Sequence, residues 1–165
     1  MQIKIKKIII NSDIFSFNFG FIGITFGLLS LLSLEPFWNS SNEVRDYQSF
    51  IFTILTIIFD TLSVISAMIA FIYGKKMYRL RQPNKKEKRW IDKRFEKLSY
   101  WFDFWSFIVG ILGLIFGLIS LVTLLPYTIN EFVSWWATFT SIFLDTFSAI
   151  AAILALTCFL KSWKK

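Results

Sequence analysis

The chain has 165 residues, of which 55% are hydrophobic, and it carries a formal net charge of +7. With 20 Phe and 7 Trp, it holds more apolar surface than a soluble domain of this length can bury, which indicates a membrane protein. The sequence has no His, one Cys and no glycine-rich phosphate loop. We therefore expect no enzymatic activity, no cofactor and no metal centre.

Four long apolar segments follow one another, at residues 14–34, 49–73, 104–126 and 132–160. Each is longer than the roughly 20 residues that a helix needs to cross a bilayer, and none has Lys or Arg in its interior. The sequence therefore predicts an all-α integral membrane protein with four transmembrane helices. Pro36 and Pro126 occupy matching places just past the glycine-rich parts of the first and third segments, and they should end those helices because proline lacks the amide that a continuing helix needs.

Nearly all basic residues lie on one side of the predicted spans. Of 18 Lys and Arg, only Arg45 lies outside residues 4–7, 75–97 and 161–165. By the positive-inside rule, both termini and the central connection are cytoplasmic. The net charge thus reflects topology, and we expect no binding to nucleic acid. The predicted location is the plasma membrane, in a bacterium the inner membrane, with the lipid bilayer as the first partner.

The sequence contains an internal tandem repeat. Residues 1–82 form a first two-helix repeat and residues 83–165 a second, which begins with an amphipathic lead-in helix expected at the membrane surface. Because both copies enter from the cytoplasm, we expect a tandem parallel repeat of two helical hairpins. The stripe at the first helix of each copy recurs ninety positions later, and it comprises Asp13, Ser16, Gly20, Gly23, Gly27 and Ser30, then Asp103, Ser106, Gly110, Gly113, Gly117 and Ser120.

The glycines of this stripe step by three and four residues and share one helix face. In lipid, helices associate where small residues let their backbones approach, as in GxxxG. The glycine stripe therefore predicts close helix packing, through Gly20, Gly23 and Gly27 in the first copy and Gly110, Gly113 and Gly117 in the second.

An acid lies in the second helix of each copy, at Asp60 and Asp145. Both acids should lie near mid-bilayer at the depth of the glycines, so each carboxyl group is expected to pack on a glycine face. An unpaired carboxylate there costs several kcal/mol. The acid is then either a neutral hydrogen-bonding contact between helices, or a site for a proton or monovalent cation, or it faces a hydrated cavity. The neighbouring hydroxyl groups belong to Thr56, Ser63, Ser141 and Ser148.

Asp13 and Asp103 stand at the predicted cytoplasmic starts of the first and third spans. An Asp at a helix N-terminus complements the dipole and can cap free amides. We predict that these two residues are helix caps, in preference to a gating role at the cytoplasmic mouth.

Hairpins with a glycine-rich first helix and an acid-bearing second helix resemble the proteolipid ring subunits of rotary ATPases. The resemblance covers the helix pattern, and those hairpins have the opposite orientation, with their polar loop in the cytoplasm. It implies only a way for a carboxyl group to sit against glycines.

Three hypotheses for function follow. The first is a small oligomeric membrane protein that binds or conducts a proton or monovalent cation through Asp60 and Asp145. The alternative is a non-transporting anchor, sensor or effector, for example of a bacterial stress or phage-defence system, that holds a soluble cytoplasmic protein. In the third, the acids only join helices. The small-residue faces favour a homo-oligomer. The basic connection that would contact a soluble partner or lipid contains Lys85, Lys86, Lys88, Arg89, Trp90, Lys93 and Arg94.

Overall fold

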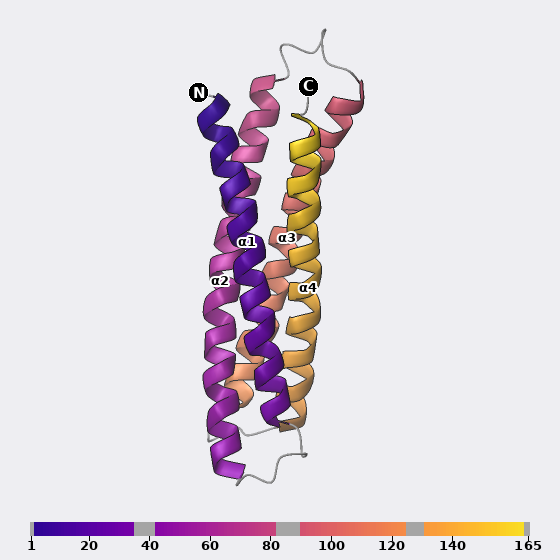
Figure 1. The fold of residues 1–165 in the computed structure, drawn as a ribbon. Coiled ribbons are helices and arrows are strands. Elements are labelled where there is room, and N and C mark those ends of the chain that lie inside the picture. The colour runs from indigo at the N-terminus through magenta and orange to yellow at the C-terminus, as the bar shows by residue number, and fades with distance from the viewer. Residues whose placement is uncertain (1, 35–41, 82–89, 125–130, 164–165) are drawn as a thin grey trace.

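The computed structural model describes residues 2–34, 42–81, 90–124 and 131–163, and within them the protein is all-helical. The four helices are all long and apolar enough to cross a membrane, which confirms this part of the prediction. In chain order they are α1 (Gln2–Leu34), α2 (Asn42–Arg81), α3 (Trp90–Thr123) and α4 (Glu131–Lys161) (Figure 1).

The helices form an elongated bundle with up-and-down topology, in which α1 packs against α2 and α4, and α3 packs against the same two helices. Helices α1 and α3 are therefore diagonal to each other, as are α2 and α4. Both described ends of the chain lie at the end of the bundle where α2 finishes and α3 begins (Figure 1). Side chains from diagonal helices can consequently meet only at the centre.

The helices extend beyond the apolar segments that define the predicted spans. Helix α3 runs without a break from Trp90 to Thr123, so the predicted lead-in is the first part of a single long helix and not a separate element. Helices α1 and α3 end at Leu34 and Thr123. Pro36, Pro126 and the last two positions of the predicted span 104–126 lie outside the described residues.

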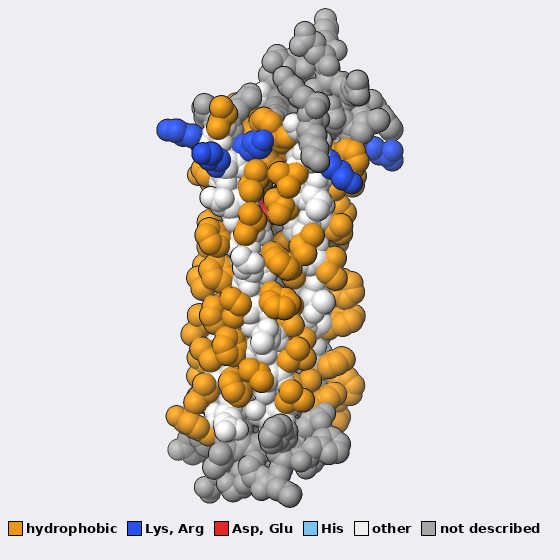
Figure 2. Space-filling view, viewed as in Figure 1, with side chains coloured by type: hydrophobic (Ala, Val, Ile, Leu, Met, Phe, Trp, Pro, Cys, Tyr) orange, Lys and Arg blue, Asp and Glu red, His pale blue; other side chains and the backbone are white. Residues whose placement is uncertain are grey.

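The bundle is apolar outside and polar inside. Orange hydrophobic side chains cover its visible flank along the whole length, whereas Lys and Arg gather at one end (Figure 2). We call this the basic end; Lys4 and Lys6 lie near the start of α1, Lys75 near the end of α2 and Lys161 at the end of α4. Large apolar side chains such as Phe21 (60% exposed) face outward, while the buried positions are mostly Ser, Thr, Asp and Ala. This arrangement suits lipid as the outer solvent.

Buried large apolar side chains form a cluster at the basic end. Ile5, Ile9, Met77 and Phe159 pack together there, and we call these four the apolar cluster. They come from α1, α2 and α4, and each is at most 5% exposed. In the middle of the bundle the buried residues are small or polar, and the candidate site lies there.

Candidate functional site: a buried polar axis

Each mid-helix acid packs on a glycine of the neighbouring helix in its own hairpin. The carboxyl group of Asp60 lies against Gly23, with its Cγ 3.3 Å from where a Cβ would stand, and that of Asp145 lies against Gly113, with its Cγ at 3.1 Å. A side chain on either glycine would displace the acid. The two contacts agree with the predicted packing of carboxyl group on glycine.

The same two acids also meet each other. Asp60 comes from α2 and Asp145 from the diagonal helix α4, and their carboxyl groups are in hydrogen-bonding contact at the centre of the bundle. Asp60 is 2% exposed and Asp145 4%. We call them the central acid pair. Because ionised carboxylates only accept hydrogen bonds, two charged groups in this position would repel each other without any bond between them.

The surroundings of the two acids differ. The Ser141 hydroxyl donates to Gly113 O at 2.8 Å and lies 3.3 Å from Asp145 Oδ2 as a second acceptor. At the equivalent position, Thr56 donates to Phe52 O in its own helix at 2.9 Å. Neither oxygen of Asp60 receives a hydrogen bond from a donor among the described residues. A proton shared with Asp145 would supply the donor that Asp60 lacks among the described residues.

A second pair of acids meets nearer the basic end. Asp13 on α1 and Asp103 on α3 are each 2% exposed, and their carboxyl groups are in hydrogen-bonding contact across the bundle. We call them the basic-end acid pair. The prediction that they cap helices is wrong, because α1 begins at Gln2 and α3 at Trp90. Both acids therefore lie well inside their helices, where the amides already have partners.

Serine hydroxyl groups join the helices of each hairpin between the two acid pairs. Ser63 donates to Ser16 O at 2.8 Å, and the two hydroxyl oxygens are 3.4 Å apart. In the second hairpin Ser148 donates to Ser106 O at 2.8 Å, with 3.2 Å between the hydroxyl oxygens. We call these the inner serine pairs. They place Ser63 and Ser148, which the sequence assigns to the acids, against serines of the glycine stripe.

Beyond the central acid pair, away from the basic end, each hairpin has three hydroxyl groups in contact. Ser30 Oγ lies 3.0 Å from Ser49 Oγ and 2.8 Å from Thr53 Oγ1. In the second hairpin, Ser120 Oγ lies 3.1 Å from Ser134 Oγ and 2.7 Å from Thr138 Oγ1. We call these the hydroxyl triads.

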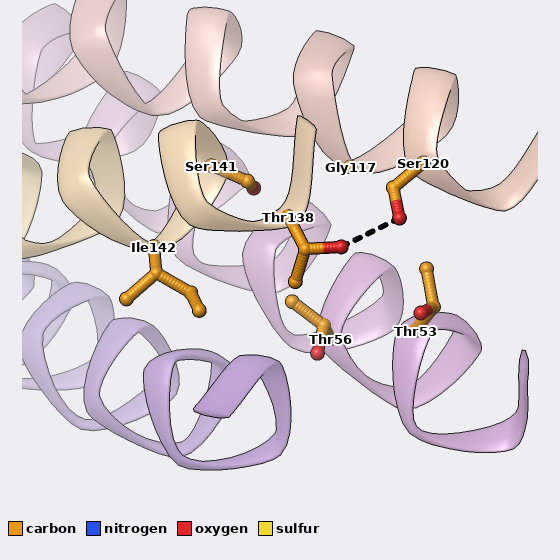
Figure 3. A pocket seen from close by; sticks show the side chains of 7 residues that line it. All are labelled: Thr53, Thr56, Gly117, Ser120, Thr138, Ser141 and Ile142. Carbon is orange, nitrogen blue, oxygen red and sulfur yellow. Dashed lines mark hydrogen bonds between the residues drawn. The ribbon is translucent and has the colours of Figure 1, made fainter. Parts of the chain in front are cut away.

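A small cavity of about 10 Å³ lies between the triads, close to the central acid pair. In Figure 3 the Thr138 and Ser120 hydroxyl groups point toward each other at its edge. This volume is about the least that one water molecule needs. The lining residues are Thr53, Thr56, Gly117, Ser120, Thr138, Ser141 and Ile142.

These groups form one polar axis along the bundle. The apolar cluster lies at the basic end. The axis begins next to it and contains, in order, the basic-end acid pair, the inner serine pairs, the central acid pair and the hydroxyl triads. Asp13 precedes Gly23 by ten residues on α1, and Gly23 contacts Asp60, so the two acid pairs are ~15 Å apart at about 1.5 Å per residue. The axis can hold protons on two dyads joined by hydroxyl groups.

The other glycines of the stripe bring the two hairpins together. A Cβ on Gly27 would stand 2.8 Å from Ile142 Cγ1 of α4, and one on Gly110 would stand 3.0 Å from Val64 Cγ2 of α2. Gly20 and Gly117 make similar but looser contacts, to Ala149 at 3.8 Å and to Ile57 Cγ1 at 3.4 Å. The glycine face of each first helix therefore contacts both neighbouring helices of the same chain.

The predicted partner surface is mostly outside the described part of the chain. Lys85, Lys86, Lys88 and Arg89 are not described, and for Trp90 and Lys93 only their place in α3 is. Arg94 lies on α3 with an exposed side chain.

Sequence reasoning missed the meeting of acids from diagonal helices. The repeated serines Ser16 and Ser106 could have indicated the inner serine pairs, because they share a helix face with the glycines.

Comparison with protein families, curated proteins and solved structures found no match to this chain.

Proposed function

We propose that the protein is a non-enzymatic integral membrane protein that binds a proton or monovalent cation at Asp60 and Asp145 and conducts it along the polar axis. The observation that carries the proposal is the contact between these two carboxyl groups at the centre of the bundle, where Asp60 has no other hydrogen-bond donor among the described residues. Intramembrane acids that face a bundle interior are typical of ion and proton pathways.

A proton is the ion that this arrangement favours. One proton bound between the two carboxyl groups supplies the missing donor and removes one of the two negative charges. A larger cation needs several oxygen ligands and space, whereas the cavity beside the pair measures about 10 Å³. The hydroxyl groups of the inner serine pairs and the triads are both donors and acceptors, so they can pass a proton in either direction.

In this proposal the chain is a tandem parallel repeat, residues 1–82 and 83–165, in the plasma membrane. The basic end faces the cytoplasm, as the positive-inside rule requires, so both termini are cytoplasmic. The homo-oligomer remains a proposal too, and because the small-residue faces are directed inward, its contacts would be made by the apolar outer flank.

Flux through liposomes tests the proposal. The purified full chain is reconstituted, and proton flux under a pH gradient is compared with Na⁺ and K⁺ flux. We expect proton flux in the parent and a loss of about 100-fold in the Asp60→Asn/Asp145→Asn variant, since a positioned proton-transfer group contributes about that factor.

Two neighbouring threonines provide matched controls. Thr61 and Thr146 directly follow the two acids, are exposed, and donate to their own helices at Ile57 O (2.7 Å) and Ile142 O (2.8 Å). The Thr61→Val/Thr146→Val variant should retain parental flux. Equal flux in the parent and the Asn variant, or none in either, contradicts the proposal.

A further inference from the structure

We propose that Asp13 and Asp103 form a second proton-binding site, in which the two carboxyl groups hold one proton between them. This site is distinct from the central acid pair and stands ~15 Å nearer the basic end at about 1.5 Å per helical residue. It gives a binding role to two residues for which the sequence favoured helix capping over a gating role.

The geometry of the pair carries the inference. The two acids reach the centre from diagonal helices, each is 2% exposed, and their carboxyl groups lie close enough to share a hydrogen bond. Oδ2 of Asp13 and Oδ2 of Asp103 are both buried without a hydrogen-bond donor among the described residues. Leaving buried oxygens unpaired is costly, and a single shared proton turns one of the facing groups into the donor that the other lacks.

The packing around the pair buries both acids, which are 2% exposed. On α2, Gly74 lies beside Asp103, and a Cβ there would stand 3.4 Å from Asp103 Oδ2. Toward the basic end, the apolar cluster separates the pair from water, and Tyr73 of α2 packs against that cluster. On α4, Cys158 lies within electrostatic reach of Asp103.

The charged groups of the basic end have other contacts. The Lys6 ammonium on α1 lies 4.4 Å from the centroid of the Trp163 ring, and the Lys161 ammonium on α4 lies 5.7 Å from that of Phe95 on α3. Glu96 of α3 is buried and has an interaction partner of its own. Among the described residues, a proton is the ligand that we propose for the unpaired oxygens of Asp13 and Asp103.

The inner serine pairs lie between this site and the central acid pair. A proton on Asp13 or Asp103 therefore has hydroxyl groups of both hairpins on its way to Asp60 and Asp145. This role as a station on a path depends on the proposed function, whereas proton binding at Asp13 and Asp103 does not.

Infrared spectroscopy of the full chain in lipid nanodiscs tests the site, because a protonated carboxyl group has its own carbonyl band, which shifts in D₂O. With one proton on each pair, Asp13→Asn/Asp103→Asn should lose about half of the band, and Asp60→Asn/Asp145→Asn the other half. Glu96→Gln, which removes a buried acid with another partner, should leave the band unchanged. The single variant Asp13→Glu keeps a carboxyl group and should shift the band without loss, so the test does not depend on the double variant folding.

Three results overturn the inference: an unchanged band in Asp13→Asn/Asp103→Asn, an unchanged band in Asp13→Glu, or a parental band that appears only when Na⁺ and K⁺ are removed. Its failure is distinguishable from that of the proposed function. If Asp60→Asn/Asp145→Asn loses flux while the Asp13 and Asp103 variants keep the parental band, the proposed function stands and the second proton site is rejected. Band loss in those variants without any flux in the parent leaves proton binding without conduction.

Discussion

The two hairpins make the same contacts in the middle of the bundle and different contacts at the basic end. In the middle, Asp60 on Gly23 is matched by Asp145 on Gly113, and the inner serine pairs and hydroxyl triads are matched as well. In the middle of the bundle, the acids and hydroxyl groups of one hairpin therefore make contacts that match those of the corresponding residues in the other hairpin.

At the basic end this correspondence is lost. Ile9 of α1 is replaced by Ser99 at the equivalent position of α3, and Met77 of α2 by Ser162 after α4. All four are buried, and the Ser162 hydroxyl donates to Phe159 O at 2.7 Å. The first hairpin thus supplies three of the four side chains of the apolar cluster. Both copies contribute equally to the polar axis, but mainly the first copy covers its end at the basic end.

The largest expected effect tests the matched middle. Gly23→Ala and Gly113→Ala each place a Cβ against the carboxyl group of an acid, which must then leave its buried position, and each should lower the free energy of unfolding by about 1–3 kcal/mol. Unfolding by SDS in mixed micelles, followed by circular dichroism, measures it. Similar losses in both variants support the matched contacts, and tolerance of either substitution contradicts them.

A control at equivalent positions should separate the hairpins. Gly27→Ala meets Ile142 Cγ1 at 2.8 Å, whereas Gly117→Ala first meets Ile57 Cγ1 at 3.4 Å, an ordinary contact. We expect Gly27→Ala to destabilise the bundle and Gly117→Ala to change the free energy of unfolding by less than about 0.5 kcal/mol, because alanine also favours the helix.

A smaller effect should distinguish the two acids of the central pair. Ser141→Ala removes the hydroxyl group that lies between Gly113 O and Asp145, and it should cost about 1 kcal/mol. Thr56→Val removes a hydroxyl group that bonds only within its own helix, so it should cost less than about 0.5 kcal/mol. Equal losses in the same unfolding assay would show that the difference between Asp60 and Asp145 is unimportant.

The smallest effect tests whether the hydroxyl triads are equivalent. Ser30→Ala and Ser120→Ala each remove the hydroxyl group that contacts the other two. Because polar contacts between membrane helices average about 0.6 kcal/mol, each variant should lose roughly that amount. A loss confined to one hairpin would show that the triads are equivalent in geometry but not in energy.

The sequence was sufficient to predict the four helices and the contact of each acid with a glycine. Both depend on local patterns: apolar length for the helices, and steps of three and four residues for the face that carries Gly23 or Asp60. Antiparallel pairing within a hairpin then sets the depth at which Gly23 meets Asp60.

Local patterns do not say which helices become diagonal. The meeting of Asp60 with Asp145 depends on how one hairpin docks on the other, and the repeat by itself allows docking within the chain or between chains. Asp13 was misjudged for a different reason. Lys4, Lys6 and Lys7 resemble a membrane-surface segment that would precede the helix. However, α1 already begins at Gln2, so Asp13 lies about three turns inside the helix and not at its start.

Either hydroxyl group of each side-chain contact in the triads can be the donor, as it can between Ser16 and Ser63. The same positions of the heavy atoms therefore accommodate two opposite orientations of these O–H dipoles. Rotating these hydrogens changes the local dipoles of the axis without moving a helix. The two acids between these clusters are not equivalent, because the Ser141 hydroxyl group lies 3.3 Å from Asp145 Oδ2, whereas neither oxygen of Asp60 has a donor among the described residues.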